Sequence, residues 1–394
     1  MNASESEAVE TWLSSFVRAD APRGEVARTA AASLFSALGE PQDRVRAVHV
    51  VGTAGKGTAA RLVADTLRRS GDTVGLHLSP HVHDIRERFT VADDLPGWAA
   101  VAEAAAEVRI ATEHLDQRPT FFAVTAAMAY VLARRAETDW LVVEAGIGGR
   151  VDATNTFNRD DVVTVVTAIG LDHCDVLGDT VEAIAAEKMA VVTGRCVAVL
   201  GPQPSDAVVA VARTCAAAAG VRLVEVAPEH DWRRDAEATA TAVVAELVPD
   251  APAVRFVEQP GRFEHHGEGS TSWIFDGAHN PMKLRALASS LADKPRPRVG
   301  VVAIGAAKAL DECATAIAPA LDRVVAVTFG GGSGPQGHEA ESVAAAFERV
   351  GVPAWPAPNP ASAAAAAKAL DPVTVVVTGS FLHLTAMRDA LQGR

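Results

Sequence analysis

The chain has few cysteines and no long apolar run. Its four cysteines, Cys174, Cys196, Cys215 and Cys313, are scattered and form no C-x-x-C pair. Because zinc sites and disulfide frameworks need paired or clustered cysteines, this spacing argues against both and favours a reducing compartment. No apolar run approaches the ~18 residues of a membrane-spanning helix, and the acidic, amphipathic N-terminal stretch is unlike a signal peptide. We therefore expect a cytoplasmic protein that does not span a membrane.

Basic runs are also missing from the sequence. The formal net charge is −13, and no cluster of lysines and arginines offsets it locally. A chain with this excess of acidic residues repels nucleic acid and anionic membranes. We therefore expect small molecules as partners, with no nucleic acid and no membrane. The 394 residues are enough for two or three domains with a large core.

What the sequence does contain is a regular alternation of apolar, β-branched runs with alanine-rich stretches of helical length. This alternation predicts an α/β fold with a mostly parallel sheet that is covered by helices on both faces. The predicted strands are 46–52, 73–80, 139–146, 161–170 and 195–201. The predicted helices are 58–71, 97–115 and 121–136.

A proline-rich stretch interrupts this alternation. Prolines surround one helical segment between 228 and 262, and we place a linker at residues 250–262. The expected domains are therefore 1–258 and 259–394. In the second domain the alternation resumes, which predicts a smaller, Rossmann-like α/β domain with a doubly wound sheet. Its predicted strands are 271–281, 298–305, 323–331 and 372–380, and 359–370 is a predicted helix.

The stretch HVVGTAGKGT (49–58) joins a predicted strand to a predicted helix through a glycine-rich turn. Such a turn points backbone N–H groups at an anion; Lys56 is placed to reach phosphates and Thr58 to bind magnesium. The spacing differs from the standard G-x-x-x-x-G-K-[ST] loop, because Gly57 separates Lys56 from Thr58. The residues alone leave open a nucleotide loop of another type, a decayed loop and an ordinary turn.

Polar residues follow further strands of the first domain. Glu144 ends an apolar run before a glycine-rich loop, where it is either a magnesium ligand or a solvated acid. His173, flanked by Asp172 and Asp175, is either a metal or phosphate neighbour or a structural histidine. Lys188 lies in an apolar helical context and is either a buried lysine with a lowered pKa or a surface lysine whose stem covers apolar area.

The second domain has a similar stretch, FDGAHNP (275–281). It places Asp276 and His279 at a strand end, immediately before a helix that Asn280 and Pro281 open. Two polar groups at such a position suit the orientation of a substrate or of ATP. Arg262 precedes them in the linker, where it is placed to contact a nucleotide.

Together these segments resemble the Mur-ligase superfamily, and within it the folylpolyglutamate synthase/dihydrofolate synthase family. The resemblance covers nearly the whole chain, and in that family a glycine also stands between the lysine and the hydroxyl residue of the loop. One matching segment could arise by chance, but seven in family order could not. The segments are GTAGKGT, GLHLSPHVHDIRERFTV, EAGIGGRVDATN, IGLDHCDVLGDTVEAIAAEK, PGRFE, DGAHNP and TGSFLHL.

The resemblance implies an ATP-dependent ligase that forms a C–N bond. It implies a P-loop, Mur-ligase-like ATPase domain in 1–258 and an amino-acid-binding domain in 259–394. ATP activates a carboxylate as an acyl phosphate, which the amine of an amino acid then attacks. In this family the amino acid is glutamate and the acid is of the folate or pteroate type. The resemblance further implies two magnesium ions, a carbamylated Lys188, and a monomer.

The same resemblance assigns roles to residues by motif. The implied catalytic residues are Lys56, Glu144, His173 and Lys188. The implied nucleotide-binding residues are Gly52, Thr53, Gly55, Lys56, Gly57, Thr58, Arg262 and Asp276. The implied metal ligands are Thr58, Ser79 and Glu144 for one ion, with His173 and Lys188 for the other. The implied substrate-binding residues are Arg150, Asp152 and His279.

The sequence departs from the family pattern at four positions. Ala54 replaces the loop asparagine, Phe122 a glutamate, Asp235 an asparagine and Ala309 an aspartate. We expect nucleotide binding to persist, because the backbone of the loop and Lys56 remain. Three hypotheses follow: a folate enzyme, a ligase with the same chemistry on another acid or amino acid, and a nucleotide-binding protein without turnover. The retained motif residues argue against the third.

Overall fold

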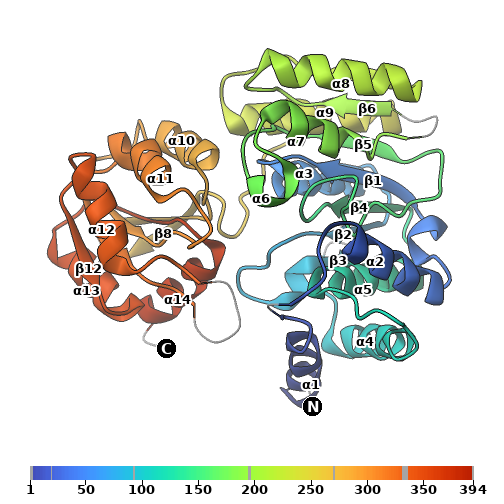
Figure 1. The fold of residues 1–394 in the computed structure, drawn as a ribbon, viewed down its shortest axis with the longest axis horizontal. Helices are drawn as coiled ribbons and strands as arrows, with labels where there is room; N and C mark the ends of the chain where they lie inside the picture. The colour runs from blue at the N-terminus through green and yellow to red at the C-terminus, as the bar shows by residue number, and fades with distance from the viewer. Residues whose placement is uncertain are drawn as a thin grey trace. The chain divides into compact units, whose positions relative to one another are not determined.

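The computed structural model describes residues 3–18, 20–91, 94–193, 197–268, 271–330 and 336–392. The chain separates into two compact units, Met1–Val257 and Glu258–Arg394, each with its own sheet (Figure 1). Cys196, the start of the predicted strand 195–201 and the end of the predicted strand 323–331 lie outside the described residues.

The described part of the first unit contains a seven-stranded sheet. Neighbouring strands are parallel except β2 and β3, which are antiparallel. The carboxyl ends of the parallel strands therefore meet at one edge, where ligands bind in open α/β sheets. In order across the sheet the strands are β3 (Phe89–Val91), β2 (Val74–His77), β4 (Trp140–Glu144), β1 (Arg46–Val51), β5 (Val163–Val166), β6 (Val197–Leu200) and β7 (Arg222–Glu225).

Helices cover both faces of this sheet, because successive residues of its central strands are buried and point to opposite faces. Val142 of β4 belongs to the buried cluster formed with α3 and α9, whereas Leu141 and Val143 belong to the cluster formed with α4 and α5. The helices are α1 (Ala3–Ser14), α2 (Gly24–Ala37), α3 (Lys56–Arg69), α4 (Trp98–Thr112), α5 (Phe121–Arg135), α6 (Cys174–Leu177), α7 (Val181–Met189), α8 (Asp206–Ala219) and α9 (Trp232–Leu247), with short 3-10 helices η1 (Pro41–Arg44) and η2 (Ile85–Arg88).

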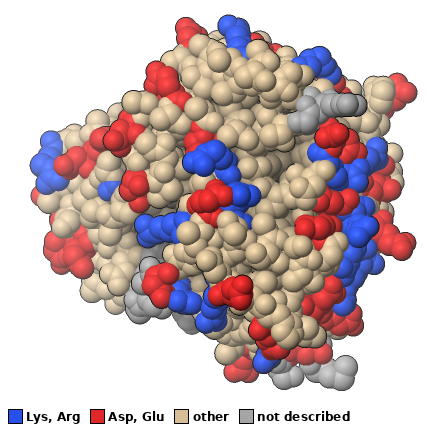
Figure 2. Space-filling model, turned by 45° about the vertical axis from the view of Figure 1, so that its right-hand side comes forward, with Lys and Arg blue, Asp and Glu red and all other residues tan. Residues whose placement is uncertain are grey.

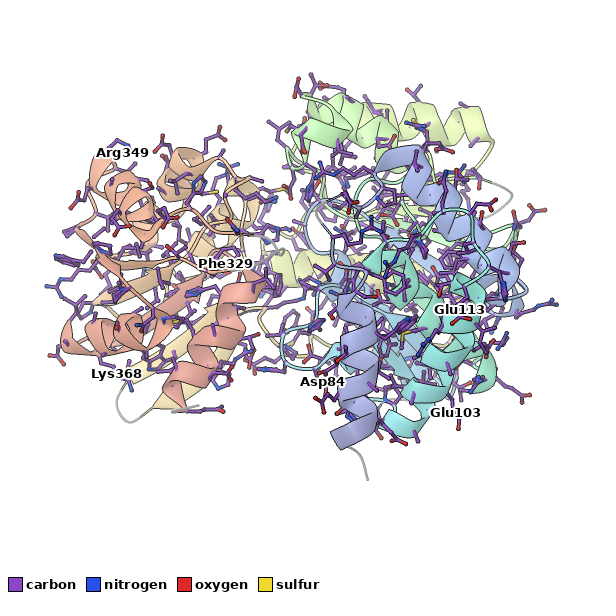
Figure 3. All side chains as sticks on the ribbon, turned by 60° about the horizontal axis from the view of Figure 1, so that its bottom comes forward. Asp84, Glu103, Glu113, Phe329, Arg349 and Lys368 are labelled. Carbon is purple, nitrogen blue, oxygen red and sulfur yellow. The ribbon has the colours of Figure 1, made fainter. Side chains whose placement is uncertain are left out.

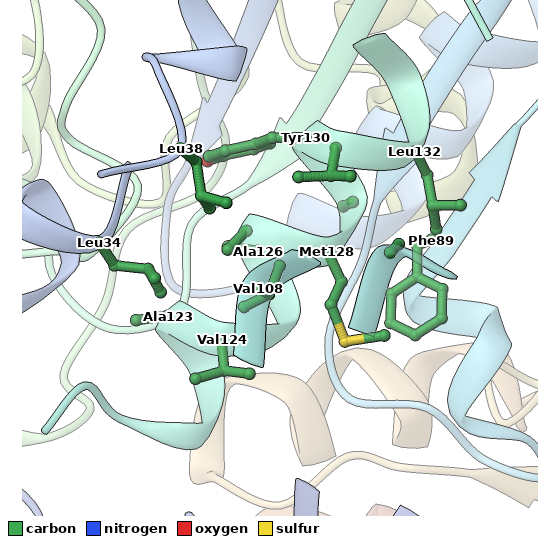
Figure 4. Close-up of a cluster of buried hydrophobic side chains, with 14 of the residues drawn as sticks. Leu34, Leu38, Phe89, Val108, Ala123, Val124, Ala126, Met128, Tyr130 and Leu132 are labelled. Carbon is green, nitrogen blue, oxygen red and sulfur yellow. The ribbon is translucent and has the colours of Figure 1, made fainter. Parts of the chain in front are cut away.

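One part of this core lies around α5 (Figure 4). Met128 of α5 packs in a cluster with Val108 of α4, Leu34 of α2 and Phe89 of β3, all of which are buried. Full burial of an apolar side chain of this size stabilises the fold by about 1.5–3 kcal/mol. The cluster therefore packs α5 against α2, α4 and β3.

The described part of the second unit contains a six-stranded sheet that is parallel except for β8 and β9. In order the strands are β12 (Ala354–Ala357), β11 (Arg323–Val327), β10 (Arg298–Val302), β13 (Thr374–Thr378), β9 (Thr271–Asp276) and β8 (Glu264–Glu268). The helices are α10 (Pro281–Ser290), α11 (Leu310–Ile317), η3 (Ala318–Ala320), α12 (Ala340–Arg349), α13 (Pro360–Ala369) and α14 (Phe381–Leu391).

The predicted fold class, α/β with mostly parallel sheets, is confirmed. The structure adds four strands that the sequence did not indicate, namely β3, β7, β8 and β12. In the part of the chain that the structure describes, no helix is both long and apolar enough to cross a membrane. On the face drawn in Figure 2, basic and acidic side chains are intermixed.

Candidate active site

A glycine-rich loop joins β1 to α3 at the carboxyl edge of the first sheet. Gly52 has a φ of 146°, and an added Cβ would lie 2.0 Å from the Thr167 Oγ1, so only glycine fits there. Gly55 has a φ of 84° and is the N-cap of α3. Lys56 begins α3, and its Nζ donates a hydrogen bond to the Gly52 carbonyl at 3.2 Å. The loop is therefore compact, and the Lys56 side chain folds back over it.

Hydrogen bonds to the segment that follows β5 hold this loop in place. Thr53 N and Ala54 N both donate to the Ala168 carbonyl, at 2.9 and 3.1 Å. The Thr53 hydroxyl donates to the Gly170 carbonyl at 3.1 Å and accepts from the Gly170 N at 3.2 Å. The first N–H groups of α3 have no partner inside the helix, so they are available to bind an anion. The loop backbone is thus an anion cradle even with alanine at position 54.

Glu144 ends β4, the strand next to β1, and Ser79 follows β2, the strand on the other side of β4. Glu144 is the last residue of β4, is 4% exposed, and its Oε2 accepts a hydrogen bond from Ser79 N at 2.8 Å. Since Val50 of β1 is in register with Glu144, this carboxylate lies at the edge of the sheet where the glycine-rich loop begins. Thr58, on the first turn of α3, is 2% exposed.

These side chains fit a magnesium ion. In the described residues, no group of three or more His, Cys, Asp or Glu side chains could hold a metal by itself. Magnesium, however, is usually bound through one or two carboxylates together with substrate phosphates and water. A single buried carboxylate, Glu144, beside an anion-binding loop and the residues Thr58 and Ser79 matches that requirement.

The second glycine-rich loop, residues 146–151, packs directly on α7. An added Cβ at Gly149 would lie 2.6 Å from both the Glu187 carbonyl oxygen and the Lys188 Cα. Glu187 holds the loop: its carboxylate accepts hydrogen bonds from Arg150 Nε (3.0 Å) and Val151 N (3.1 Å), and its carbonyl accepts one from Arg150 N (2.9 Å). The loop and the helix therefore form one structural unit.

Lys188 is buried in this unit, which decides between the two interpretations of its sequence context. It is 4% exposed, and its Nζ lies 3.5 Å from the Gly148 carbonyl oxygen. Burial, and secondarily the positive charge of Lys56, lowers the pKa of Lys188 to about 7. A large fraction of Lys188 is therefore a neutral amine near neutral pH, which is the nucleophilic form.

Asp152 stabilises the same loop through hydrogen bonds to its side chain. Its Oδ2 accepts a hydrogen bond from Ile147 N at 2.7 Å, and its Oδ1 accepts from Thr154 N and Oγ1, at 2.9 and 2.6 Å. His49 Nε2 contacts the same Thr154 hydroxyl at 2.8 Å. Burial raises the pKa of Asp152 above its usual value, although these hydrogen bonds oppose the shift. Both oxygens of Asp152 thus bind the loop, so substrate binding by Asp152 stays a prediction.

His173 lies further along the chain from Gly170, the residue that contacts Thr53. It has a φ of 52° and is the N-cap of the short helix α6. Its side chain is 37% exposed, and its Nε2 lies 3.9 Å from the Asp172 Oδ2. His173 is therefore partly exposed and lies near the glycine-rich loop between β1 and α3, as a residue that binds a metal would. Metal binding by His173 stays a prediction.

In the second unit, Asp276 ends β9 and organises the residues around it. Its two carboxylate oxygens accept hydrogen bonds from Phe263 N and Ala278 N, both at 2.8 Å. Burial raises the pKa of Asp276 to about 6, opposed by these hydrogen bonds and by the charge of Arg262. The Arg262 Cζ lies 5.3 Å from the centre of the Phe381 ring. The charge of Arg262 thus acts on Asp276, and nucleotide binding by the two residues stays a prediction.

His279 lies three residues beyond Asp276 and has a defined tautomer. Its Nδ1 lies 2.7 Å from the Gly277 carbonyl oxygen, so Nδ1 carries the proton. Its Nε2 is then the acceptor for Lys283 Nζ, at 3.1 Å. The imidazole is therefore neutral and oriented, with a lysine ammonium group beside it.

Sequence reasoning missed the part played by Glu187 and the surroundings of Phe122. Glu187 was not among the residues selected from the sequence, although its place beside Lys188 in the matched segment IGLDHCDVLGDTVEAIAAEK was a signal. Phe122, one of the four departures, packs against Gly146, where an added Cβ would lie 2.9 Å from the ring. Its ring also lies 5.4 Å from that of His77. This departure therefore places an apolar ring against Gly146, which follows Glu144 by two residues in the sequence.

Comparisons with known proteins agree with this geometry. The family described as "Mur ligase, glutamate ligase domain" matches residues 261–381. The chain is 31% identical to the dihydrofolate synthase/folylpolyglutamate synthase of Escherichia coli, over 88% of this chain and 86% of that protein. The structure of the Mycobacterium tuberculosis folylpolyglutamate synthase complexed with ADP superposes with a TM-score of 0.88 at 28% identity, over 100% of this chain and 99% of that one.

Another relative is longer than this chain. The probable bifunctional folylpolyglutamate synthase/dihydropteroate synthase of Halobacterium salinarum is 32% identical over 91% of this chain but only 48% of its own length. The chain therefore spans about half the length of that relative. The match with the Escherichia coli protein, in contrast, extends over most of both chains. The chain therefore belongs to the folylpolyglutamate synthase/dihydrofolate synthase family.

Proposed function

We propose that the protein is an ATP-dependent ligase that joins the amine of glutamate to the carboxylate of a folate- or pteroate-type acid. The observation that carries the proposal is the meeting of an anion cradle, a buried carboxylate and a buried lysine at one edge of the first sheet. The full match to a folylpolyglutamate synthase complexed with ADP supports ATP as the phosphoryl donor.

The chemistry proceeds in two steps. An oxygen of the acid's carboxylate attacks the γ-phosphorus of ATP, so that an acyl phosphate forms and ADP leaves. The amine of glutamate then attacks the acyl carbon, and an amide, inorganic phosphate and a proton are released. The site must exclude water, because hydrolysis of the acyl phosphate would waste the ATP.

In this proposal the N-terminal end of α3 and Lys56 bind the ATP phosphates. Glu144, Thr58 and Ser79 hold one magnesium ion, which when bound neutralises negative charge on the phosphates. His173 and a carbamylated Lys188 hold a second ion. Carbamylation requires the neutral amine, and the lowered pKa of Lys188 supports it. The nitrogen bonds to carbon dioxide and a proton is released.

The remaining assignments concern orientation. Arg262 and Asp276 contact the nucleotide, and the neutral His279 with Lys283 binds the amino acid, whose carboxylates suit the Lys283 ammonium group. Arg150 and Asp152 shape the loop on the acid's side through their bonds to Glu187 and Ile147. We also propose that the protein acts as a monomer in the cytoplasm.

A second candidate shares this chemistry but not the acid. The Phe122 ring, which contacts Gly146 and His77, replaces a carboxylate of the family with an apolar group beside the loop that follows Glu144. A change of charge at such a place alters which acid is bound, because an unpaired polar group there is costly. We therefore retain a different acid, or a different amino acid, as the alternative.

The test measures phosphate release from ATP and magnesium with dihydropteroate, tetrahydrofolate and a panel of other acids, each with glutamate and other amino acids. Glutamate-dependent release with a pterin acid supports the folate assignment. Release only with another acid supports the alternative. No release with any combination, although ATP binds, would contradict both.

Variants connect this test to the site. Lys188→Ala should abolish phosphate release, and added bicarbonate should not restore it. The control is Lys368→Ala, which removes an exposed lysine of α13 (Figure 3). Near-normal release by Lys188→Ala would show that Lys188 is not a carbamylated ligand.

A further inference from the structure

Arg88, the last residue of η2, is a buried cation. The residue is 7% exposed, and its Nε donates a hydrogen bond to the His81 Nδ1 at 2.8 Å. Among the described residues, no Asp or Glu oxygen lies within 4.0 Å of its guanidinium. Burying a charge without a paired counter-ion costs free energy, so such residues are usually matched by an anion. The positive charge of Arg88 therefore needs an anion, which a ligand can supply.

The geometry leaves one edge of the guanidinium open to that ligand. The Phe121 ring lies over one face, with the Arg88 Cζ 5.0 Å from its centre. In the described residues, neither Nη atom of Arg88 has a hydrogen-bond partner. Both Nη atoms keep some exposure to solvent, because they are not among the fully buried polar atoms without a partner. An anion therefore approaches in the plane of the guanidinium, where the two Nη groups form a fork that matches a carboxylate.

The backbone fixes Arg88 before any ligand binds. The Arg88 carbonyl accepts hydrogen bonds from His77 Nδ1 (2.9 Å) and Leu78 N (3.1 Å). Glu87, the preceding residue, accepts bonds from Val82 N and His83 N, both at 2.8 Å, and so closes the segment that carries His81. A cation held in this way loses little conformational entropy on binding.

Arg88 also lies close to the proposed reaction centre. Leu78, which bonds to the Arg88 carbonyl, precedes Ser79, whose N bonds to the Glu144 carboxylate at 2.8 Å. Burial lowers the pKa of Arg88 to about 10, even though the negative charges of Glu144 and Glu87 oppose this shift. The two acids therefore compensate the buried charge only in part.

We propose that the Arg88 guanidinium binds the carboxylate of the acid substrate and holds it for attack on the γ-phosphate. This inference rests on the proposed function, because it assigns a residue to the acid of that reaction. In this arrangement the cation that pairs with the reacting carboxylate is a protein side chain, Arg88, and not a metal ion. It also makes His81 a positioning residue, since its Nδ1 orients the fork through Arg88 Nε.

The test compares the full-length protein with Arg88→Gln, Arg88→Lys and Arg86→Gln, using dihydropteroate and its carboxamide as ligands. Arg86→Gln is the matched control, because Arg86 lies on the same turn but pairs with Asp84, which is labelled in Figure 3. Dissociation constants are measured by calorimetry with ATP and magnesium omitted, and the KM for each substrate is measured by phosphate release.

For Arg88→Gln we expect the dissociation constant and KM of the acid to rise about 10- to 100-fold, with the KM of ATP within about two-fold of wild type. The carboxamide should bind equally to wild type and variant, because it lacks the charge that Arg88 recognises. Arg88→Lys should fall between the two, since an ammonium keeps the charge but not the fork. Arg86→Gln should match the wild type.

Two results would overturn the inference alone. One is an unchanged KM for the acid in Arg88→Gln; the other is an equal loss of acid and carboxamide, which would indicate a structural role. Failure of the proposed function looks different, because the wild type itself then releases no phosphate with any acid of the panel, and the inference falls with it. If another acid is the substrate, that acid and its carboxamide replace the pterin pair.

Discussion

Gly149 lies against the backbone of Lys188 so closely that an added Cβ would be 2.6 Å from the Lys188 Cα. This contact limits how closely the second glycine-rich loop and α7 approach, and the hydrogen bonds of the Glu187 carboxylate hold the loop there. Gly149 thereby lets the loop approach the buried lysine, and it does so without a positive φ. The position is thus a steric requirement of the site.

Gly149→Ala should separate the loop from α7. A Cβ forced against backbone atoms displaces one element, which costs about 1–3 kcal/mol of stability. A shift of about 1 Å in a site of this kind lowers kcat by about 100-fold. Thermal unfolding and phosphate release measure the two effects. Gly97→Ala is the control, because an added Cβ meets no atom within 4 Å there; equal behaviour of both variants would contradict the steric argument.

Glu187→Ala should loosen the same loop without adding volume. The change removes the acceptor of the Arg150 Nε and Val151 N hydrogen bonds. We expect faster hydrogen exchange at the Val151 amide and a lower kcat, with a local loss of about 1–3 kcal/mol. Glu182→Ala, at an exposed position on the first turn of α7, should change neither quantity. Unchanged exchange in Glu187→Ala would show that steric contact alone holds the loop.

Asp276 should make stability depend on pH in the acidic range. Its pKa is about 6 in the folded protein and 3.8 in the unfolded reference. The folded state therefore binds more protons between these values, so this contribution is present below pH 3.8 and is lost as pH rises through 6. The loss is at most about 3 kcal/mol.

Chemical denaturation of wild type and Asp276→Asn across pH 4 to 7.5 measures this dependence. The difference in stability between the two should shift against the wild type as the pH rises. The ¹³C shift of the Asp276 carboxyl group should titrate near pH 6. A titration midpoint near 4 would mean that the two backbone hydrogen bonds outweigh burial.

Ala54→Asn should have only a modest effect on ATP. The backbone of residue 54 already bonds to the Ala168 carbonyl, so the substitution adds an amide side chain to an intact loop. One added hydrogen bond to a phosphate strengthens ATP binding by about 3- to 10-fold. Calorimetric titration with a non-hydrolysable ATP analogue measures the change. No ATP binding by the wild type, with binding restored by Ala54→Asn, would show that the loop has decayed.

Much of the fold could be predicted because its central strands are continuous apolar runs, as in RAVHVV and WLVVE. The strands that were missed have other patterns. β8 reads EHHGE, β12 contains Pro356, and β7 is partly exposed at the end of its sheet. Edge strands of this kind bury only one side or neither, so their sequences carry no continuous apolar signal.

For the candidate site, too, the sequence predicted some features and not others. The sequence predicted that Lys56, Glu144 and Asp276 lie at or just after strand ends, from the glycine pattern and from polar residues that follow apolar runs. This was possible because strand direction alone decides which residues lie at the carboxyl edge of a parallel sheet. The contacts of Glu187 with Val151 and of Arg88 with the Phe121 ring could not be predicted, since each joins segments far apart in the sequence. No spacing rule connects such residues before the sheet has formed.

By itself the sequence determined the parallel α/β class, the two glycine-rich loops and the motif residues, because these follow from local periodicity and from backbone conformations that only glycine adopts. Only the tertiary structure decided how those residues behave chemically. Lys188 has a pKa near 7 because α7 and the second loop exclude water from it. Among the described residues, no carboxylate oxygen lies within 4.0 Å of the Arg88 guanidinium, which packs against the Phe121 ring. Burial is a property of packing, and packing is set by residues far apart in the chain.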